Sequence, residues 1–193
     1  MATKCRPGTS GMISCRAPVD VVSEILSKDA SQMPGLSIAC YNSTEDIVVA
    51  GPLQSLEEFG EHCKTKGIKQ KKLPVPFGFH SCAMDPIVDG LKACASSLHF
   101  RPPQIKIGSS LCGQVLHPEE DFDEQYLVKH TREPVKFSDL VASFSAELSG
   151  SDVNILEVGP AVTSKSSRGP TSNCNTFRST FTPFSTQCPA LYF

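Results

Sequence analysis

The order of short apolar runs in the first half of the chain most constrains its fold. Residues 36–42 and 45–51 are apolar runs of strand length, joined by a polar turn. A helical stretch follows at 55–67, where Ser55 and Glu58 have the spacing of a capping box. The pattern predicts a hairpin of two buried strands that is followed directly by a helix.

One more strand and one more helix are predicted after this unit, and another helix is predicted before the hairpin. Residues 71–80 return as an apolar run ending at His80, and its two prolines predict an edge or irregular strand. Residues 84–98 have helical periodicity, as do residues 20–29 before the hairpin. With one more strand ahead of the first helix, this order would make a small ferredoxin-like unit.

The second half of the chain is less regular. Residues 104–116 are strand-like with a turn at Gly113, and residues 123–148 hold two helical stretches broken near Pro134. The continuous apolar run 153–160 is typical of a central strand that is covered on both faces.

Composition excludes some classes of function. The chain has 193 residues, 39% of them hydrophobic and 20% charged, so it can bury a core in one domain. A net charge of -2 gives no reason to expect a nucleic-acid partner. No apolar run approaches a membrane span, and the first residues lack the apolar core of a secretory signal.

The cysteines indicate free thiols. There are nine, an odd number, and no two have the C-x-x-C spacing. Without a secretory signal, we expect reduced thiols in a cytoplasmic protein rather than a disulfide framework. Neither paired cysteines nor a histidine pair occurs at ligand spacing, so we expect no zinc site.

Four stretches together resemble one family. They are ACYNSTEDIVVAG at 39–51, GFHSCAMDP at 78–86, YLVKHTREPVKF at 126–137 and ILEVGP at 155–160. The chain resembles the acyltransferase domain of polyketide synthases and the malonyl-CoA:acyl-carrier-protein transacylases of fatty-acid synthesis. The likeness keeps the family's order and spacing from about residue 11 to residue 160.

The resemblance implies an α+β fold in which a ferredoxin-like small subdomain adjoins C-terminal remnants of an α/β-hydrolase-like acyltransferase core. We divide the chain accordingly. Residues 1–35 are a lead-in segment with a helix, 36–100 the small subdomain, and 101–162 the remnant of the large subdomain. Residues 163–193 are rich in Ser, Thr and Pro and are expected to be a disordered tail.

The family's nucleophile motif is missing. Relatives carry a serine in Gly-His-Ser-x-Gly, on a sharp turn between a strand and a helix. GTSG at 8–11 lacks a residue, GSSLCG at 108–113 has one too many, and neither follows a strand and opens a helix. The family's carboxylate-binding arginine and its oxyanion-hole glutamine belong to the same missing part. We expect no nucleophile in this chain.

The resemblance assigns roles to three residues. His80 matches the general base, which takes a proton from the serine and later from the carrier-protein thiol. His130 matches the residue whose backbone carbonyl orients that base, and its own side chain is expected to be solvated. Phe79 matches a selectivity position, where a large ring favours malonyl units by crowding an α-methyl group.

Each assignment has a simpler alternative. Taken alone, His80 could be a hydrogen-bonded surface or core histidine, and Phe79 a packing ring. If the segment before the helix is extended, Ser81 faces away from His80 while Cys82 shares its side, although a buried thiol is the commoner state. A basic run could meet an acidic carrier protein or coenzyme A phosphates, or simply be a solvated helix end. The run comprises Lys64, Lys66, Lys69, Lys71 and Lys72.

Two functions from different classes follow. The first is the acyltransferase part of a polyketide or fatty-acid synthase, with a complementary chain or a longer product supplying the nucleophile. Its acyl donor would be a coenzyme A thioester, and its acceptor the phosphopantetheine of an acyl carrier protein. The second is a catalytically inert relative, or a module that binds carrier protein or other synthase domains.

Overall fold

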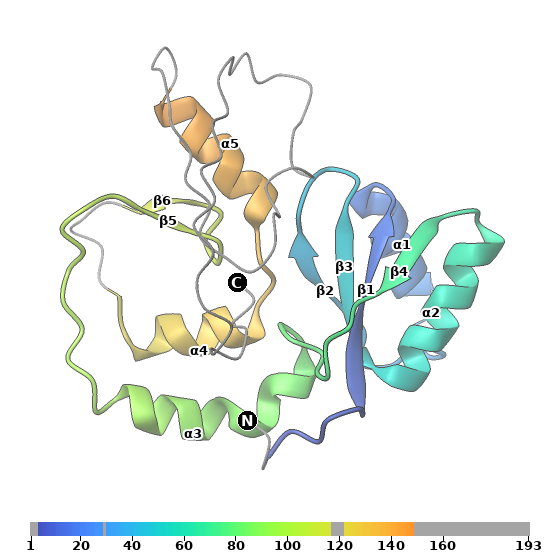
Figure 1. Cartoon of the computed structure of the whole chain (residues 1–193), viewed down its shortest axis with the longest axis horizontal. Coiled ribbons are helices and arrows are strands. Elements are labelled where there is room, and N and C mark those ends of the chain that lie inside the picture. The colour runs from blue at the N-terminus through green and yellow to red at the C-terminus, as the bar shows by residue number, and fades with distance from the viewer. Residues whose placement is uncertain (1–3, 29, 117–121, 149–193) are drawn as a thin grey trace.

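The structure is a computed structural model that describes residues 4–28, 30–116 and 122–148 (Figure 1). Its elements, in chain order, are β1 (Ser10–Arg16), α1 (Val19–Lys28), β2 (Ser37–Tyr41), β3 (Ile47–Pro52), α2 (Leu53–Thr65), β4 (Lys69–Lys72), the short 3-10 helix η1 (Cys82–Met84), α3 (Asp85–Ala95), β5 (Ile107–Ser109), β6 (Gln114–Leu116), α4 (Glu124–Arg132) and α5 (Phe137–Glu147).

The first part of the described chain forms a four-stranded sheet in the order β2-β3-β1-β4. Each neighbouring pair is antiparallel, with Ile13 of β1 opposite Val49 of β3 and Lys72 of β4. With α1 after β1 and α2 after β3, this is the expected ferredoxin-like βαββαβ order. Its first strand lies in the segment predicted as a lead-in, and it occupies an interior position of the sheet.

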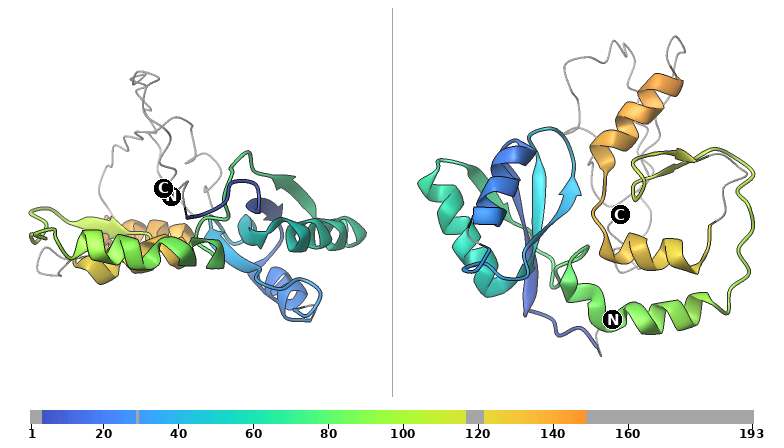
Figure 2. Two further views of the ribbon diagram at one scale, coloured as in Figure 1. Left: turned by 90° about the horizontal axis from the view of Figure 1, so that it is seen from below. Right: turned by 180° about the vertical axis from the view of Figure 1, so that it is seen from behind.

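One face of the sheet is covered by α1 and α2, and Figure 2 shows these helices on the opposite side of the molecule from α4 and α5. Alternate strand residues, such as Ile13 and Val49, meet Val22 of α1 and Leu56 and Phe59 of α2. Phe59 is fully buried. This face forms the main hydrophobic core, because helical and strand periodicities place their apolar residues against each other.

The chain beyond β4 crosses the opposite face of the sheet, where Leu73, Val75 and Phe79 pack over Met12 and its buried neighbours. The predicted strand from 71 to 80 is wrong beyond Lys72, where β4 ends. Leu73 still donates to the Met12 carbonyl at 2.9 Å. The following residues have no strand, because prolines at 74 and 76 lack the N–H that a ladder requires.

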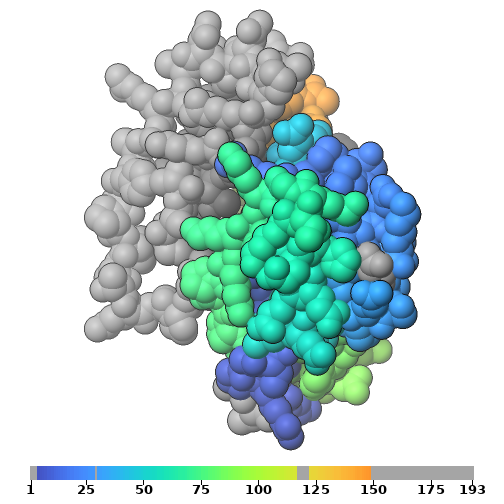
Figure 3. All heavy atoms as spheres, turned by 90° about the vertical axis from the view of Figure 1, so that its right-hand side faces the viewer, coloured from blue at the N-terminus to red at the C-terminus, as the bar shows by residue number. Residues whose placement is uncertain are grey.

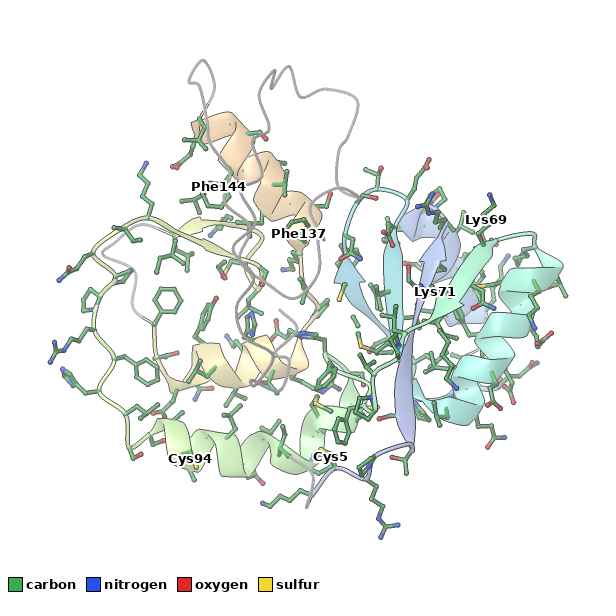
Figure 4. The ribbon with its side chains drawn as sticks, in the orientation of Figure 1. Cys5, Lys69, Lys71, Cys94, Phe137 and Phe144 are labelled. Atoms are coloured by element: carbon green, nitrogen blue, oxygen red, sulfur yellow. The ribbon has the colours of Figure 1, made fainter. Side chains whose placement is uncertain are left out.

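The second part of the described chain contains α3, α4, α5 and the β5–β6 hairpin. Gly113, at φ 74°, forms the predicted turn of the hairpin. The hairpin packs on α5 so closely that a Cβ at Gly108 would overlap the ring of Phe144, which Figure 4 labels on α5. Beside them, α4 lies along α3 (Figure 1).

The two parts are joined through the backbone of Val135. Its N–H donates to the Ala39 carbonyl, and its carbonyl accepts from the N–H of Tyr41, both at 2.8 Å. Val135 thereby adds a short parallel bridge to β2, the outer strand of the sheet. The bridge covers an otherwise open strand edge and fixes the chain that leaves α4 against the small subdomain.

The fold is thus α+β with an antiparallel sheet. The apolar run 153–160 and the predicted tail 163–193 lie outside the described residues, as does the end of the segment 101–162.

Replacing Val135 with proline tests the bridge. The change removes the N–H that bonds to Ala39 and leaves that carbonyl unpaired, so we expect a loss of about 1–3 kcal/mol of unfolding free energy. Denaturant unfolding measures this loss, and hydrogen exchange should show faster exchange of the Tyr41 amide. V135A, which keeps the N–H, is the matched control for lost side-chain packing. Equal effects of the two variants on Tyr41 exchange would contradict the role of the bridge.

Candidate active site

His80 lies in a tight turn between β4 and η1. At φ 57° it is the one non-glycine residue in the left-handed region among those described. Three hydrogen bonds support the turn: the Gly78 N–H to Ser10 Oγ at 2.9 Å, Ser81 Oγ to the Gly78 carbonyl at 2.6 Å, and the Ala83 N–H to Ser81 Oγ at 3.2 Å. A non-glycine residue adopts this backbone conformation only where its surroundings impose it.

Gly78 leaves little space for a side chain. A Cβ there would lie 3.1 Å from each of the Gly11 carbonyl oxygen, the Gly51 nitrogen and Ser81 Oγ. The turn therefore packs directly on the backbones of β1 and β3. Glycine at this position thus has a consequence that the sequence did not suggest: it lets the turn approach the sheet closely.

The ring of His80 is oriented by a backbone carbonyl. Nδ1 lies 3.0 Å from the carbonyl oxygen of Glu133. A carbonyl only accepts, so neutral His80 carries its proton on Nδ1 and keeps the lone pair on Nε2. Burial lowers the pKa of His80 below its ordinary value of 6.5, the Glu133 carbonyl opposes that change, and the charge of His130 adds to it. The neutral form, which can accept a proton, is therefore favoured.

The orienting carbonyl was expected at His130, three residues before Glu133. The His130 carbonyl does contribute, because it also raises the pKa of His80, but less than the Glu133 carbonyl does. Helix α4 ends at Arg132, and Glu133 beyond it is extended, at φ -87° and ψ 160°. Its carbonyl oxygen thereby lies within hydrogen-bond distance of His80 Nδ1, at 3.0 Å.

The side chain of His130 is not simply solvated. Its Nε2 lies 3.3 Å from Ser110 Oγ, and its ring stacks on Tyr126, one helical turn earlier. The rings of His130 and His80 meet edge to face with their centroids 6.0 Å apart. Burial lowers the pKa of His130. The spacing of four residues from Tyr126 was the one sequence signal for this arrangement.

The serines of GSSLCG have structural partners. Ser109 is buried, pairs with the Tyr126 hydroxyl at 2.9 Å and accepts from the Cys112 N–H at 3.2 Å. Ser110 follows β5 in a hairpin, whereas a nucleophile elbow leads from a strand into a helix. Ser10, in the other short motif, is buried and holds Gly78.

Phe79 is half-buried and forms an edge-to-face pair with Phe77, with ring centroids 5.9 Å apart. It packs against the apolar clusters of Met12 and of Met84. The ring therefore has a packing role next to His80, whatever its effect on substrate choice.

The neighbours of His80 do not offer a substitute nucleophile. Ser81 is fully buried with both hydrogen bonds inside the turn. The extended geometry assumed for Cys82 is wrong, because η1 begins there and its Sγ approaches the Gly35 carbonyl at 3.4 Å. The described cysteines are all free. Burial raises the pKa of Cys15 and Cys40 to about 12, so those thiols stay protonated.

The basic run lies at the end of α2 and on β4, and Figure 3 shows these two segments next to each other on one face of the molecule. Figure 4 labels Lys69 and Lys71 on β4, the strand at the opposite edge of the sheet from β2. Acidic residues of α2 adjoin the run, and Lys64 pairs with Glu61 at 2.6 Å. A cavity of about 800 Å³ adjoins the basic run and is lined in part by Glu57, Glu61 and Lys72. Its mixed charge does not by itself favour an acidic partner.

The described residues contain neither a membrane-spanning helix nor a group of metal ligands. No helix there is both long and apolar enough to cross a membrane. In that same part of the chain, no three His, Cys, Asp or Glu side chains cluster as metal ligands would.

Comparison with known proteins identifies the family. The profile of the acyl transferase domain matches residues 11–161, so the chain belongs to the acyl transferase domain family. It is 34% identical over 163 residues to the conidial yellow pigment biosynthesis polyketide synthase of Emericella nidulans. The matched region covers 83% of this chain and 7% of that protein. It is also 34% identical over 159 residues to polyketide synthase 2 of Metarhizium guizhouense.

Solved structures agree with this assignment. The malonyl CoA-acyl carrier protein transacylase from Clostridium perfringens superimposes with a TM-score of 0.73 at 26% identity, over 83% of this chain and 50% of that one. The acyltransferase domain from the second module of the salinomycin polyketide synthase gives 0.71 at 28% identity, over 80% of this chain and 34% of that one. The chain therefore spans at most about half the length of either.

Replacing Ser81 with alanine tests the support of the turn. The variant leaves the Gly78 carbonyl and the Ala83 N–H without their partner in a buried site, so we expect about 1–3 kcal/mol less unfolding free energy. Thermal or denaturant unfolding measures it. S96A, which removes an exposed hydroxyl bonded to the Lys92 carbonyl, is the control and should change stability little. Equal stability of S81A and wild type would contradict this role.

Proposed function

We propose that this chain supplies the general base and the small subdomain of an acyltransferase that moves an acyl group from coenzyme A to an acyl carrier protein. The observation that carries the proposal is His80: a half-buried imidazole in a strained turn, with Nδ1 bonded to a backbone carbonyl and the lone pair on Nε2. Family membership supports the reaction class, and the name of the Clostridium protein indicates the donor and acceptor.

The base acts in both halves of the reaction. Nε2 of His80 takes the proton of the attacking serine hydroxyl, whose oxygen bonds to the thioester carbonyl carbon. The carbon–sulfur bond breaks, and the departing thiolate of coenzyme A receives the proton from His80. In the second half, His80 takes the proton of the phosphopantetheine thiol, whose sulfur attacks the acyl-serine. The serine oxygen leaves and regains the proton.

The attacking serine comes from outside these 193 residues, which contain no Gly-His-Ser-x-Gly. A longer product or a complementary chain would supply it, together with the strands that complete an α/β-hydrolase-like core. Residues 101–162 would then belong to that large subdomain and residues 36–100 to the small one. Phe79, next to the base, would favour malonyl units because its ring crowds an α-methyl group.

A second candidate is a non-catalytic module that binds carrier protein or neighbouring synthase domains. The absence of the nucleophile motif from the sequence favours it for the chain alone. The basic residues of β4, exposed on the outer strand, would be its contact surface. In either case the protein would act in the cytoplasm, with synthase domains as partners.

A reconstituted reaction tests the first candidate. The chain is mixed with the missing N-terminal half of an acyltransferase domain, and malonyl transfer to carrier protein is measured with a labelled donor. We expect H80A to slow transfer by about 10²–10⁴-fold, the range for removal of a general base. H99A, which changes an exposed histidine beyond α3, is the control and should retain full activity.

Two results would contradict the proposal. An inactive wild-type mixture whose halves demonstrably associate would favour the non-catalytic module. Equal rates for H80A and wild type would remove His80 from the mechanism.

A further inference from the structure

A second imidazole lies beside the base and is held in place from two other directions. The ring of His130 meets that of His80 edge to face, with centroids 6.0 Å apart and planes 79° apart. The ring of Tyr126 stacks on that of His130, with centroids 5.9 Å apart and planes 24° apart. Ser110 Oγ lies 3.3 Å from Nε2 of His130. Helix α4 and the hairpin thus fix one ring against the base.

Ser110 and Tyr126, which contact the ring of His130, each belong to a segment that has further hydrogen bonds. The Ser110 carbonyl accepts from the Lys136 N–H at 2.6 Å, which ties the hairpin to the chain after α4. The Tyr126 hydroxyl pairs with the buried Ser109 at 2.9 Å. Side chains four residues apart share a helix face, so Tyr126 and His130 move together with α4.

We propose that the His130 side chain is a positioning residue for His80, holding the ring of the base edge to face within the site. The inference deepens the proposed function and rests on it, since the effect bears on acyl transfer only if His80 is the base. It assigns to the side chain a role separate from that of the backbone carbonyl.

Electrostatics gives the sign of the effect. Two imidazolium ions 6.0 Å apart repel each other, and the separation is shorter than the screening length of about 8–10 Å at ordinary ionic strength. Burial is the largest cause that lowers the pKa of His80, and the charge of His130 lowers this pKa further. A lower pKa keeps the base neutral, and therefore able to accept a proton, to more acidic pH.

Other charged groups near the pair act less on the base. The titratable groups on the surrounding elements are Asp85, Asp89, Lys92 and Cys94 on α3, Glu124, Tyr126, Lys129 and Arg132 on α4, Glu133 and Lys136 after α4, Cys82 in η1 and Cys112 in the hairpin. Asp85 and Arg132 form an ion pair at 2.5 Å, so their charges offset each other. Within the described residues, His130 is the side chain whose charge shifts the pKa of His80.

Histidine titration by NMR tests the proposal on the full chain, with no need for the other half of the enzyme. Ring resonances of wild type, H130Q and H99Q are followed against pH and assigned with H80Q. Glutamine keeps a polar side chain near Ser110 but carries no charge. We expect the midpoint of His80 to move to higher pH in H130Q and to stay at the wild-type value in H99Q.

The wild type provides a second readout that needs no change at position 130. Coupled groups titrate in shared steps, so the His80 resonance should show a second inflection at the pH where His130 titrates. A single-step His80 curve in wild type would overturn the proposal. So would a His80 midpoint in H130Q that is unchanged or moves to lower pH.

The reconstituted reaction separates this inference from the proposed function. In an active mixture, the acidic limb of the rate profile should move to higher pH in H130Q. Coupled NMR titration in a mixture that associates but is inactive would support the interaction and sink the acyltransferase assignment. An active mixture whose H130Q profile matches wild type would overturn the interaction alone.

Discussion

The geometry of the site depends on two backbone hydrogen bonds between Val135 and the outer strand of the sheet. They hold the chain that leaves α4 beside β2, and this places the Glu133 carbonyl 3.0 Å from Nδ1 of His80. The same segment bonds to the hairpin through Lys136 and Ser110. The segment that follows α4 thus bonds to β2 on one side and to the hairpin on the other. This brings β2, the hairpin and the end of α4 together around the imidazole of His80.

Periodicity predicted most of the elements that form the four-stranded sheet and its two covering helices, but not all of them. The pair of strands β2 and β3 and the helices α1 and α2 follow from apolar spacing. The ferredoxin-like order of these elements was correct. The first strand was missed because it is only seven residues long and mixes polar residues, such as Ser10 and Ser14, with small or apolar ones. The strand predicted up to His80 was wrong, since apolar character alone hid the effect of two prolines on hydrogen bonding.

The arrangement of the candidate site follows from the sequence only in part. His80 followed from the motif around it, yet its left-handed backbone could not, because that conformation depends on Ser10 and Ser81 contacts made by the folded chain. The shift of the main carbonyl from His130 to Glu133 depends on where α4 ends, a boundary that sequence fixes poorly. The pairing of His130 with Ser110 joins residues 20 positions apart, and no local pattern reports such a contact.

The central claim is that the backbone carbonyl after α4 holds His80 with its proton on Nδ1 and its lone pair on Nε2. Long-range proton–nitrogen NMR of the imidazoles, at a pH where His80 is neutral, reads the tautomer directly, with H80Q used to assign the signal. The structure predicts the Nδ1–H form of His80. A neutral His80 that carries its proton on Nε2 would contradict the account, because it could neither donate to the Glu133 carbonyl nor accept a proton at Nε2.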